Sequence, residues 1–298
     1  MDADYDLFAG IVAAGGLSAA ARAAGISPAM VSKRLARLEE RLGVRLVHRT
    51  TRRFALTDAG ERFHTDLVAI LAAVAEAEAR VTGGAGTVSG PLRVSAPTSF
   101  GRLHVAPHLP LFLGRHPNVA LQFDLADGFA DLVAERIDVA VRIASQVPAS
   151  LVAHRLGASR RVLCAAPAYL AVHGAPADLG DLGRHRLLAA EGQMPWRLAS
   201  GRTRRSIDRP SHVRTNSSEL VRELALAGVG IALRSLWDVS GSLASGALVR
   251  VLPEWEGSAE AGIFAVHPRS PIVPPAVDAF VAFLRETVDP AAWEAGSS

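Results

Sequence analysis

The chain has 298 residues, of which 49% are apolar and 20% are charged, and its formal net charge is +3. This composition excludes disorder as the dominant state and predicts at least two packed domains. One cysteine excludes an internal disulfide framework. No apolar run reaches the roughly 18 residues that span a bilayer, and the start MDADYD lacks the basic region of a secretory signal. The simplest interpretation is a soluble cytoplasmic protein without a membrane partner.

Positive charge is concentrated in one short stretch. Residues 28–53 hold eight basic and two acidic side chains, whereas residues 83–298 hold 21 basic and 19 acidic ones. A compact positive block favours a polyanionic partner. A solvated basic helix face is the alternative interpretation, and the local pattern has to decide between the two.

The first sixty residues predict three helices, expected at 4–14, 19–24 and 28–42. Ser18 is expected to cap the second helix, and Gly25 to end it. Ser27 and Pro28 form an N-cap followed by proline at the first helical position, which predicts the start of the third helix. Gly43 is expected to end that helix.

The third helix has two different faces. Its apolar residues are spaced by four, three and four, which predicts one buried face: Val31, Leu35, Leu38 and Leu42. The opposite face begins with small residues and continues with cations: Ala29, Ser32, Lys33, Ala36 and Arg37. Small side chains allow a helix to enter the major groove, and cations then contact phosphates and base edges.

A basic hairpin is predicted after the third helix, with short strands at 45–49 and 53–56 joined by residues 50–52. Such a wing would contact the backbone of double-stranded DNA beside the groove. Two helices joined by a turn also occur in enzymes and in four-helix proteins, but the capped third helix and the cationic wing favour DNA. The candidate DNA-binding residues are Ser18, Ser27, Pro28, Ala29, Met30, Ser32, Lys33, Arg34, Arg37, Arg49, Arg52 and Arg53.

A long helix is predicted from Asp58, capped by Thr57, to about Val81. Its apolar residues follow a heptad pattern: Phe63, Leu67, Ile70, Val74, Ala77 and Val81. Packing on a domain would bury this stripe, but pairing with a second copy of the chain is favoured. Residues 82–90, TGGAGTVSG, predict a hinge and domain boundary, with a surface loop as the alternative.

The remaining residues predict an α/β unit with two lobes. A first set has strands at 92–96, 120–125 and 138–143, with helices near 100–114 and 128–135. A second set has strands at 161–166, 187–190 and 230–233 and a helix near 217–227; strands at 248–252 and 262–267 and a helix near 274–288 follow. This alternation predicts parallel βαβ units and a cleft between the lobes.

Hydroxyl residues stand before two of these helices, Thr98 and Ser99 in one lobe and the segment 215–218 in the other. Hydroxyls and the first N–H groups of a helix suit a carboxylate or another anion. Simple N-capping is the equally weighted alternative. The candidate effector-binding residues are Thr98, Ser99, Phe100, Thr215, Asn216 and Ser217.

Residues 5–61 closely resemble the N-terminal domain of LysR-type transcriptional regulators. The matching segments are 17–22 (LSAAAR), 26–32 (ISPAMVS), 38–44 (LEERLGV), 48–52 (HRTTR) and 56–60 (LTDAG). The later part resembles the effector domain of the family more loosely, through residues 131–133, 136–142 and 228–233. Many members have glutamine where Pro28 stands, so a base contact from glutamine does not carry over.

The resemblance implies a winged helix-turn-helix at 1–58, a linker helix and hinge at 59–90, and a periplasmic-binding-protein-like effector domain at 91–298. One subdomain would use 91–160 with 267–298, and the other 161–266. It also implies a small, acidic effector between the subdomains, a homodimer or a tetramer built from dimers, and contact with RNA polymerase. The expected function is sequence-specific transcription regulation.

Two rival classes have weaker support. An enzyme is disfavoured because neither a phosphate-binding loop nor a nucleophile elbow is present. His104 and His108 lack a nearby carboxylate or thiol, so no metal or cofactor is expected. Cys164 lies in an apolar strand and is expected to be buried and inert rather than redox-active. A transport solute-binding protein would leave residues 1–60 unexplained.

Overall fold

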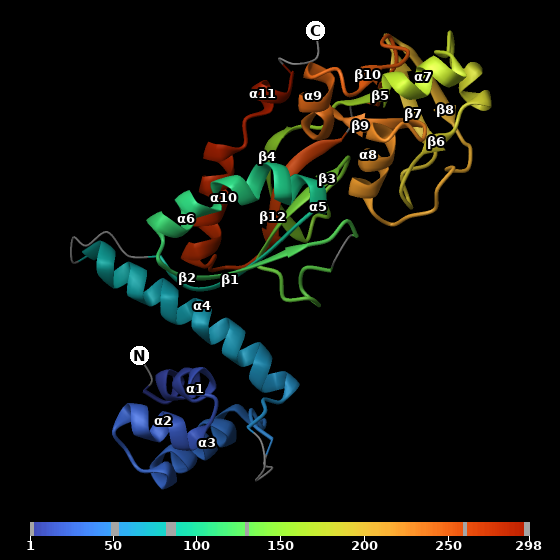
Figure 1. Cartoon of the computed structure of the whole chain (residues 1–298). Helices are drawn as coiled ribbons and strands as arrows, with labels where there is room; N and C mark the ends of the chain where they lie inside the picture. Colours follow the sequence, from blue (N-terminus) through green and yellow to red (C-terminus); the bar gives the residue numbers. More distant parts are fainter. Residues whose placement is uncertain (1–2, 49–53, 82–87, 129–130, 259–260, 295–298) are drawn as a thin grey trace. The chain divides into compact units, whose positions relative to one another are not determined.

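The computed structural model of the chain describes residues 3–48, 54–81, 88–128, 131–258 and 261–294. The chain divides into two compact units. The head unit comprises residues 1–90 with 270–276, and the receptor unit comprises residues 91–269 with 277–298. Helices dominate the first and two sheets dominate the second (Figure 1). Within the described residues, no helix combines the length and the apolar character needed to cross a membrane.

The head unit contains the helices α1 (Ala3–Ala13), α2 (Leu17–Ala24), α3 (Pro28–Leu42) and α4 (Asp58–Val81), all close to their predicted positions. Ser27 caps α3 as predicted, because its Oγ accepts the N–H of Met30 at 3.2 Å. Gly43 ends α3 with a left-handed φ of 68°. The predicted cap of α2 is wrong: α2 begins at Leu17, so Ser18 lies inside the helix and is exposed.

The wing is described only near its base. Val47 and Leu56 form one antiparallel bridge, and His48 N–H donates to the carbonyl of Ala55 at 2.9 Å. The two predicted strands therefore approach each other as expected, although the pairing is a single bridge in the described part. Arg49, Arg52 and Arg53 lie outside the described residues.

The receptor unit is built mainly from the strands named β1 to β12. Their bounds are β1 (Ser89–Ala96), β2 (Asn118–Leu125), β3 (Val139–Ala144), β4 (Leu151–Ala158), β5 (Arg161–Ala165), β6 (Leu187–Leu188), β7 (Trp196–Ser200), β8 (Thr203–Ile207), β9 (Ile231–Ser235), β10 (Val249–Arg250), β11 (Glu256–Gly257) and β12 (Gly262–Pro268). Its helices include α5 (Thr98–Phe100), α6 (Leu109–Arg115), α7 (Pro167–His173), α8 (Ser218–Leu226), α9 (Leu236–Ala244), α10 (Pro275–Thr287) and α11 (Pro290–Glu294).

These strands form two sheets, each the centre of one lobe. The first lobe has the order β2-β1-β3-β12-β4, and the second has β6-β9-β5-β11-β7-β8 with β10 against β5. The predicted parallel units account for only part of the strand pairing. β1 pairs with β3 and β6 with β9 in parallel, but β12 is antiparallel to both β3 and β4, and β5 is antiparallel to β9.

The predicted boundary between the lobes is also wrong at one end. Residues 262–266 were expected in the second lobe, but they belong to β12 in the middle of the first sheet. Alternation of apolar and polar residues identifies a strand without identifying its partners. The chain therefore enters the second lobe after β4 and returns to the first at β12.

Two predicted helices differ from the structure. The helix expected near 100–114 is a run of short helical types, with a π-helix at Gly101–Val105 and a 3-10 helix at Ala106–His108 between α5 and α6. Pro107 and Pro110 explain the interruptions, because proline lacks the N–H that continues an α-helix. The helix expected near 128–135 is wrong, since residues 132–136 form a turn.

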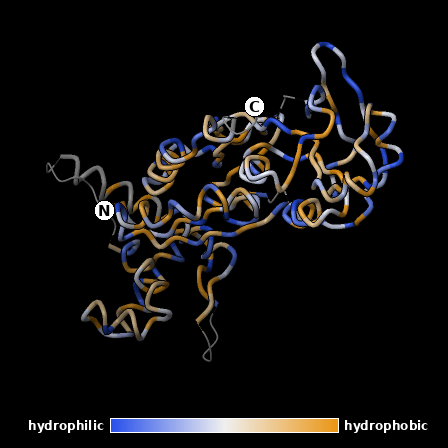
Figure 2. Tube along the Cα trace, turned by 45° about the horizontal axis from the view of Figure 1, so that its top comes forward, coloured by the Kyte–Doolittle hydropathy of each residue, from blue (hydrophilic) through white to orange (hydrophobic). Residues whose placement is uncertain are grey.

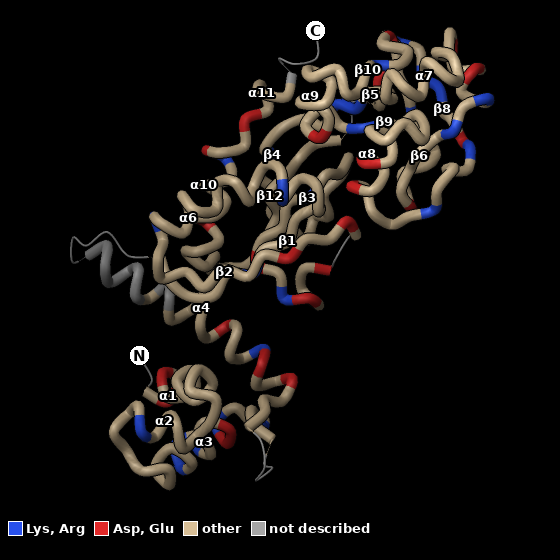
Figure 3. The backbone as a smooth tube through the Cα atoms, viewed as in Figure 1, with Lys and Arg blue, Asp and Glu red and all other residues tan. Residues whose placement is uncertain are grey.

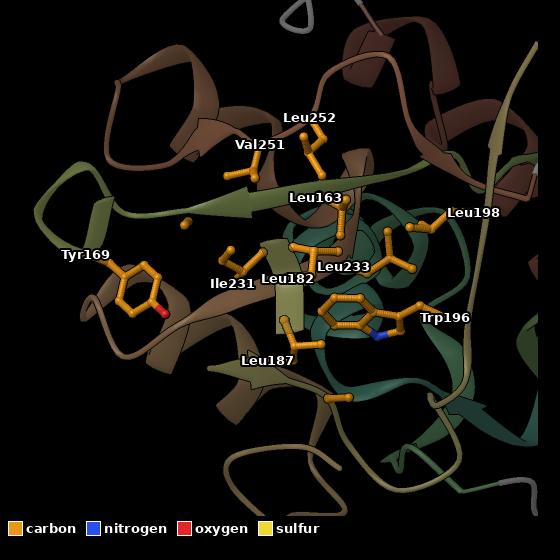
Figure 4. Packing of buried hydrophobic residues seen from close by; sticks show 12 residues of the cluster. Leu163, Tyr169, Leu182, Leu187, Trp196, Leu198, Ile231, Leu233, Val251 and Leu252 are labelled. Carbon is orange, nitrogen blue, oxygen red and sulfur yellow. The ribbon is translucent and has the colours of Figure 1, made fainter. Parts of the chain in front are cut away.

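Each lobe has its own apolar packing. In the first, Phe112 of α6 packs at 5.1 Å between ring centroids on Phe280 of α10. In the second, Leu163 and Leu233 from adjacent strands pack with Trp196 of β7 (Figure 4). Figure 2 shows hydrophobic stretches along the interior strands and hydrophilic stretches along the outer loops of this lobe. These cores fix the strand ends that line the pocket between the lobes.

Candidate functional site

The exposed face of α3 carries the residues expected to contact DNA. Ser27, Pro28, Ala29, Met30, Ser32 and Lys33 are exposed, and Met30 retains 50% of its accessible surface. The opposite residues Val31 and Leu38 are fully buried. The structure therefore confirms the two faces predicted for this helix. Figure 3 shows basic positions along α3.

Arg34 and Arg37 have a partner that the sequence did not reveal. Arg34 Nε donates to Asp4 Oδ1 at 2.6 Å, and Arg37 donates to Asp4 Oδ2 through Nε at 2.9 Å and Nη2 at 2.5 Å. Asp4 is only 4% exposed. Its burial opposes ionisation, but the hydrogen bonds from both arginines hold the pKa of Asp4 below its ordinary value. Arg37 stays 69% exposed while so oriented, whereas Arg34 is 25% exposed.

A second buried carboxylate, Glu39 of α3, holds the base of the wing. Its Oε1 accepts the N–H groups of Leu46 at 2.8 Å and Val47 at 3.2 Å, and its Oε2 pairs with Arg45 at 3.1 Å. The position of Glu39 beside the apolar face of α3 is the sequence signal that could have identified this role. Leu38 and Leu42 flank the same face, where a solvated acid is not expected.

The heptad stripe of α4 is divided between two environments. Leu67 is 2% exposed and packs in the core of the head unit, and Phe63 packs there edge-on against Tyr5 and at a tilt against Phe8, both at 5.6 Å between ring centroids. Leu67 is buried within its own chain, which corrects its assignment to a dimer interface. Phe63 is half-buried, and its place in that interface stays a prediction. Ile70 is 43% exposed and Val74 is half-buried. The side chain of Val81 lies outside the described ones.

The receptor unit contains a pocket of about 670 Å³ between its lobes. Both sheets contribute to the lining, with β3 and the segment after β2 on one side and β5, β7 and β9 on the other. This volume lies in the range of about 300–1,000 Å³ that is usual for small-molecule sites. The predicted cleft is therefore present.

Four arginines line this pocket: Arg142 of β3, Arg161 of β5, Arg197 of β7 and Arg234 of β9, of which Arg197 is exposed. Arg142 and Arg234 are 7% and 3% exposed. Burial lowers the pKa of Arg142 and of Arg161, but arginine remains charged at neutral pH. Figure 3 shows the basic positions on β5 and β9. A charged residue inside an apolar strand, as in Val141-Arg142-Ile143, is the signal that could have identified them.

Arg234 is held by its own acid. Its Nε and Nη2 donate to Asp238 Oδ2 at 2.8 and 2.5 Å, and its Nη1 donates to Ser218 Oγ at 2.8 Å. In contrast, Arg161 Nε is buried and has no hydrogen-bond partner within the described residues, and the same holds for Ser99 Oγ. The pocket wall therefore combines an oriented cation with two buried donors that have no partner within the described residues.

The candidate effector residues are only partly brought together. Ser99 and Asn216 line the pocket. The backbone N–H of Thr98 donates to Asp127 Oδ1 at 2.9 Å. Phe100 is wrong as a pocket residue, because it is completely buried and packs edge-on against Trp237 at 5.2 Å.

In the second hydroxyl segment, the serine that lines the pocket is one residue later than predicted. Ser217 caps α8, since its Oγ accepts the N–H of Leu220 at 3.2 Å. Thr215 Oγ1 accepts the N–H of Ser217 at 3.0 Å and so shapes the same turn. Neither lines the pocket, whereas Ser218 does. The capping alternative is therefore correct for Ser217, and Thr215 stabilises the turn before the helix.

Cys164 and His104 occupy structural positions. Cys164 is completely buried, as predicted, and burial raises the pKa of its thiol to about 12. His104 Nε2 lies 2.8 Å from the carbonyl oxygen of Trp237, and burial lowers the pKa of His104. Among the described residues, histidine, cysteine and acidic side chains form no group suited to a metal ion.

Comparison with known proteins agrees with both halves of this architecture. Residues 3–61 match the family described as bacterial regulatory helix-turn-helix protein, lysR family, and residues 85–289 match the LysR substrate binding domain. The chain is 38% identical over 273 residues to the HTH-type transcriptional activator TtdR of Escherichia coli O6:K15:H31, covering 90% of this chain and 87% of that protein.

Two further similarities extend over nearly the full length. The chain is 38% identical over 287 residues to the HTH-type transcriptional regulator DmlR of Escherichia coli K12, covering 95% of this chain and 93% of that protein. The structure of CrgA, a LysR-type transcriptional regulator from Neisseria meningitidis, is similar with a TM-score of 0.62 and 28% identity over 97% of this chain and 99% of that one.

A helical DNA-binding head joined to a two-lobed α/β receptor defines the class of ligand-responsive transcription regulators. The chain belongs to the LysR family of bacterial transcriptional regulators. Its relatives are regulators rather than enzymes. The fold expected from the sequence is thereby confirmed.

Proposed function

We propose that this LysR-family regulator binds double-stranded DNA with α3 and the wing, and that a small acidic metabolite in the receptor pocket controls it. The convergence of Arg142, Arg161 and Arg234 on one pocket carries the second half of the proposal. A carboxylate is the group that best matches such buried guanidinium donors.

For DNA, the small residues Ala29 and Ser32 allow α3 to approach base edges, and Lys33 supplies a cation on the same face. Arg37 stays exposed beside them while Asp4 orients its guanidinium. Arg49, Arg52 and Arg53 remain proposed phosphate contacts from the sequence. Base contacts would give sequence preference and phosphate contacts would give general affinity.

Binding to sites selected from a random-sequence DNA library tests this division. Lys33→Ala should change the preferred site, with discrimination reduced by about 1–3 kcal/mol. Arg52→Ala should weaken binding to every sequence and reduce the salt slope by about one. Arg62→Ala, on exposed α4 surface, serves as the matched control. Equal losses on selected and random DNA for both variants would contradict the proposal.

For the effector, we propose that an acid contacts Arg161 and Ser99, whose buried Nε and Oγ lack partners within the described residues. A carboxylate that enters the pocket loses its hydration, which is unfavourable. Charge-assisted hydrogen bonds from these donors offset that loss. The ligand would bridge the lobes and so favour one arrangement of them, which is the requirement for a control signal.

A panel of small carboxylic acids and their neutral amides tests the pocket by thermal shift and calorimetry. An acid should raise the melting temperature, and Arg161→Gln should weaken its binding at least about tenfold through loss of a charge-assisted hydrogen bond. Arg155→Gln, an exposed arginine on β4, is the control. Equal binding of amides and acids would contradict an acidic effector.

We also propose assembly into a homodimer or a tetramer of dimers, with contact to RNA polymerase during activation. The incompletely buried part of the α4 stripe, with Ile70 exposed and Val74 half-buried, supports pairing with a second copy. Two heads in one assembly would contact two half-sites separated by a whole number of DNA turns. Footprinting of the intact protein on selected sites measures this spacing.

A further inference from the structure

The carboxylate of Asp127 joins the two lobes of the receptor unit. Its Oδ1 accepts the N–H of Thr98 at 2.9 Å, directly after β1 of the first lobe. Its Oδ2 accepts the N–H of Ser218 at 2.7 Å, at the start of α8 in the second lobe. Asp127 itself follows β2 of the first lobe. One side chain therefore connects both lobes and uses one oxygen for each.

The surroundings of this carboxylate favour an anion. Charge-assisted hydrogen bonds to backbone N–H groups are about twice as strong as neutral ones. The N-terminus of the nine-residue helix α8 adds partial positive charge at Ser218. Arg234 Nη1 and Gln193 Nε2 both donate to Ser218 Oγ, at 2.8 and 3.0 Å. These two bonds hold Ser218 in place, and its backbone N–H is the donor that the second lobe gives to the carboxylate of Asp127.

A second observation points to a ligand at the same place. Ser99, next to Thr98 in the chain, is 2% exposed, and its Oγ has no hydrogen-bond partner within the described residues. Asp127, Ser99 and Ser218 all line the pocket. A carboxylate-bearing molecule that replaced Asp127 would therefore have an additional donor within the same wall.

We propose that this position is a carboxylate-binding subsite that the protein fills with its own side chain. Asp127 holds the lobes together in the absence of a ligand, and the carboxylate of an effector binds here by displacing it. One part of this inference, that the carboxylate of an acidic effector binds at this position, rests on the proposed function. Its test uses formate and acetate, so it does not depend on knowing the effector.

Another contact between the lobes differs from the Asp127 bridge. Arg102 Nε pairs with Glu219 Oε1 at 2.7 Å, but both side chains lie outside the pocket lining. A small anion in the pocket can replace Asp127 without disturbing that pair. The lobes should therefore remain associated, although less tightly, when the carboxylate of Asp127 is removed.

Hydrogen exchange of the full-length Asp127→Ala variant is the test, measured on peptides that contain Thr98 and Ser218. Exchange at both amides should accelerate about tenfold, which corresponds to losing one charge-assisted hydrogen bond at each. Sodium formate or acetate should restore protection in the variant, whereas sodium chloride at equal ionic strength should not. In the wild-type protein, formate should have little effect because Asp127 occupies the subsite.

Asp131→Ala is the matched control. The Oδ1 of Asp131 also accepts two backbone N–H groups, from Val133 at 3.0 Å and Ala134 at 3.2 Å, but within one lobe. Its removal should leave exchange at Ser218 unchanged and create no response to formate. Asp127→Asn, which keeps one carbonyl acceptor, provides the same test at smaller amplitude if the alanine variant does not fold.

Unchanged exchange at Ser218 in both Asp127 variants, or accelerated exchange that neither formate nor acetate reverses, overturns the subsite. Failure of every acid in the effector panel with wild-type protein would instead refute the proposed function. In that case, formate protection of Asp127→Ala would still support the subsite. The two proposals can therefore fail separately.

Discussion

The head and receptor units use buried charge in opposite ways. In the head, the buried carboxylate of Asp4 orients arginines on α3, and that of Glu39 pairs with Arg45 at the base of the wing. In the receptor, the buried arginines Arg142 and Arg234 line a concave pocket. Both arrangements present positive charge, and under the proposed function the first would contact an extended polymer and the second would enclose a small molecule. The shape of the surface, rather than the sign of its charge, therefore distinguishes the two ligand classes.

The largest expected effect comes from the buried ion pair of the receptor. Arg234→Met leaves Asp238, whose side chain is completely buried, without its closest partner. Removal of one member of a buried pair costs about 3–5 kcal/mol. Urea unfolding of the receptor transition measures this loss, and the double variant Arg234→Met with Asp238→Leu should recover part of it. A loss below about 1 kcal/mol would show that the pair is dispensable, since that is the level of an exposed pair.

The next effect separates the two parts of the α4 stripe. Leu67→Ala should destabilise the head by about 2–5 kcal/mol, because it leaves a cavity in the core. Ile70→Ala, at an exposed position, should change head stability by less than about 0.5 kcal/mol but weaken self-association. Urea unfolding and sedimentation equilibrium provide the two measurements. If Leu67→Ala dissociated the assembly while leaving the head stable, the division proposed for this helix would be incorrect.

A smaller effect concerns the acid that orients the α3 arginines. Because the folded-state pKa of Asp4 lies below its ordinary value of 3.8, its stabilising contribution is present above that value. The contribution is lost as pH falls through the lower, folded-state pKa. The stability difference between wild type and Asp4→Asn should thus shrink in strong acid, as measured by urea unfolding across pH. Asp6→Asn, an exposed acid on the same helix, provides the control.

The smallest effect is expected at the thiol. Because burial raises the pKa of Cys164 to about 12, the native protein should react very slowly with a disulfide reagent at neutral pH. The reaction should become rapid in denaturant, and Cys164→Ala should retain DNA binding. Rapid modification of the folded protein, accompanied by altered DNA binding, would instead indicate a redox role.

Local patterns predicted much of the head. The Ser27-Pro28 start, the 4-3-4 apolar spacing and the terminal Gly43 are sufficient to place α3 and its exposed face, because capping and helical periodicity act within a few residues. The receptor was predicted less well. The turn at 132–136 was expected to be a helix, but Asp131 closes it by accepting two N–H groups, and Arg136 adopts a φ of 55°.

The sequence alone determined the division into head and receptor, the exposed face of α3, and the family to which the chain belongs. Tertiary structure decided which strands pair and which charged residues meet. β12 joins the first sheet after the chain has built the second, and Asp127 meets Ser218 across 91 positions. Such contacts depend on packing between distant segments, whereas caps and periodic faces depend on neighbours in the chain.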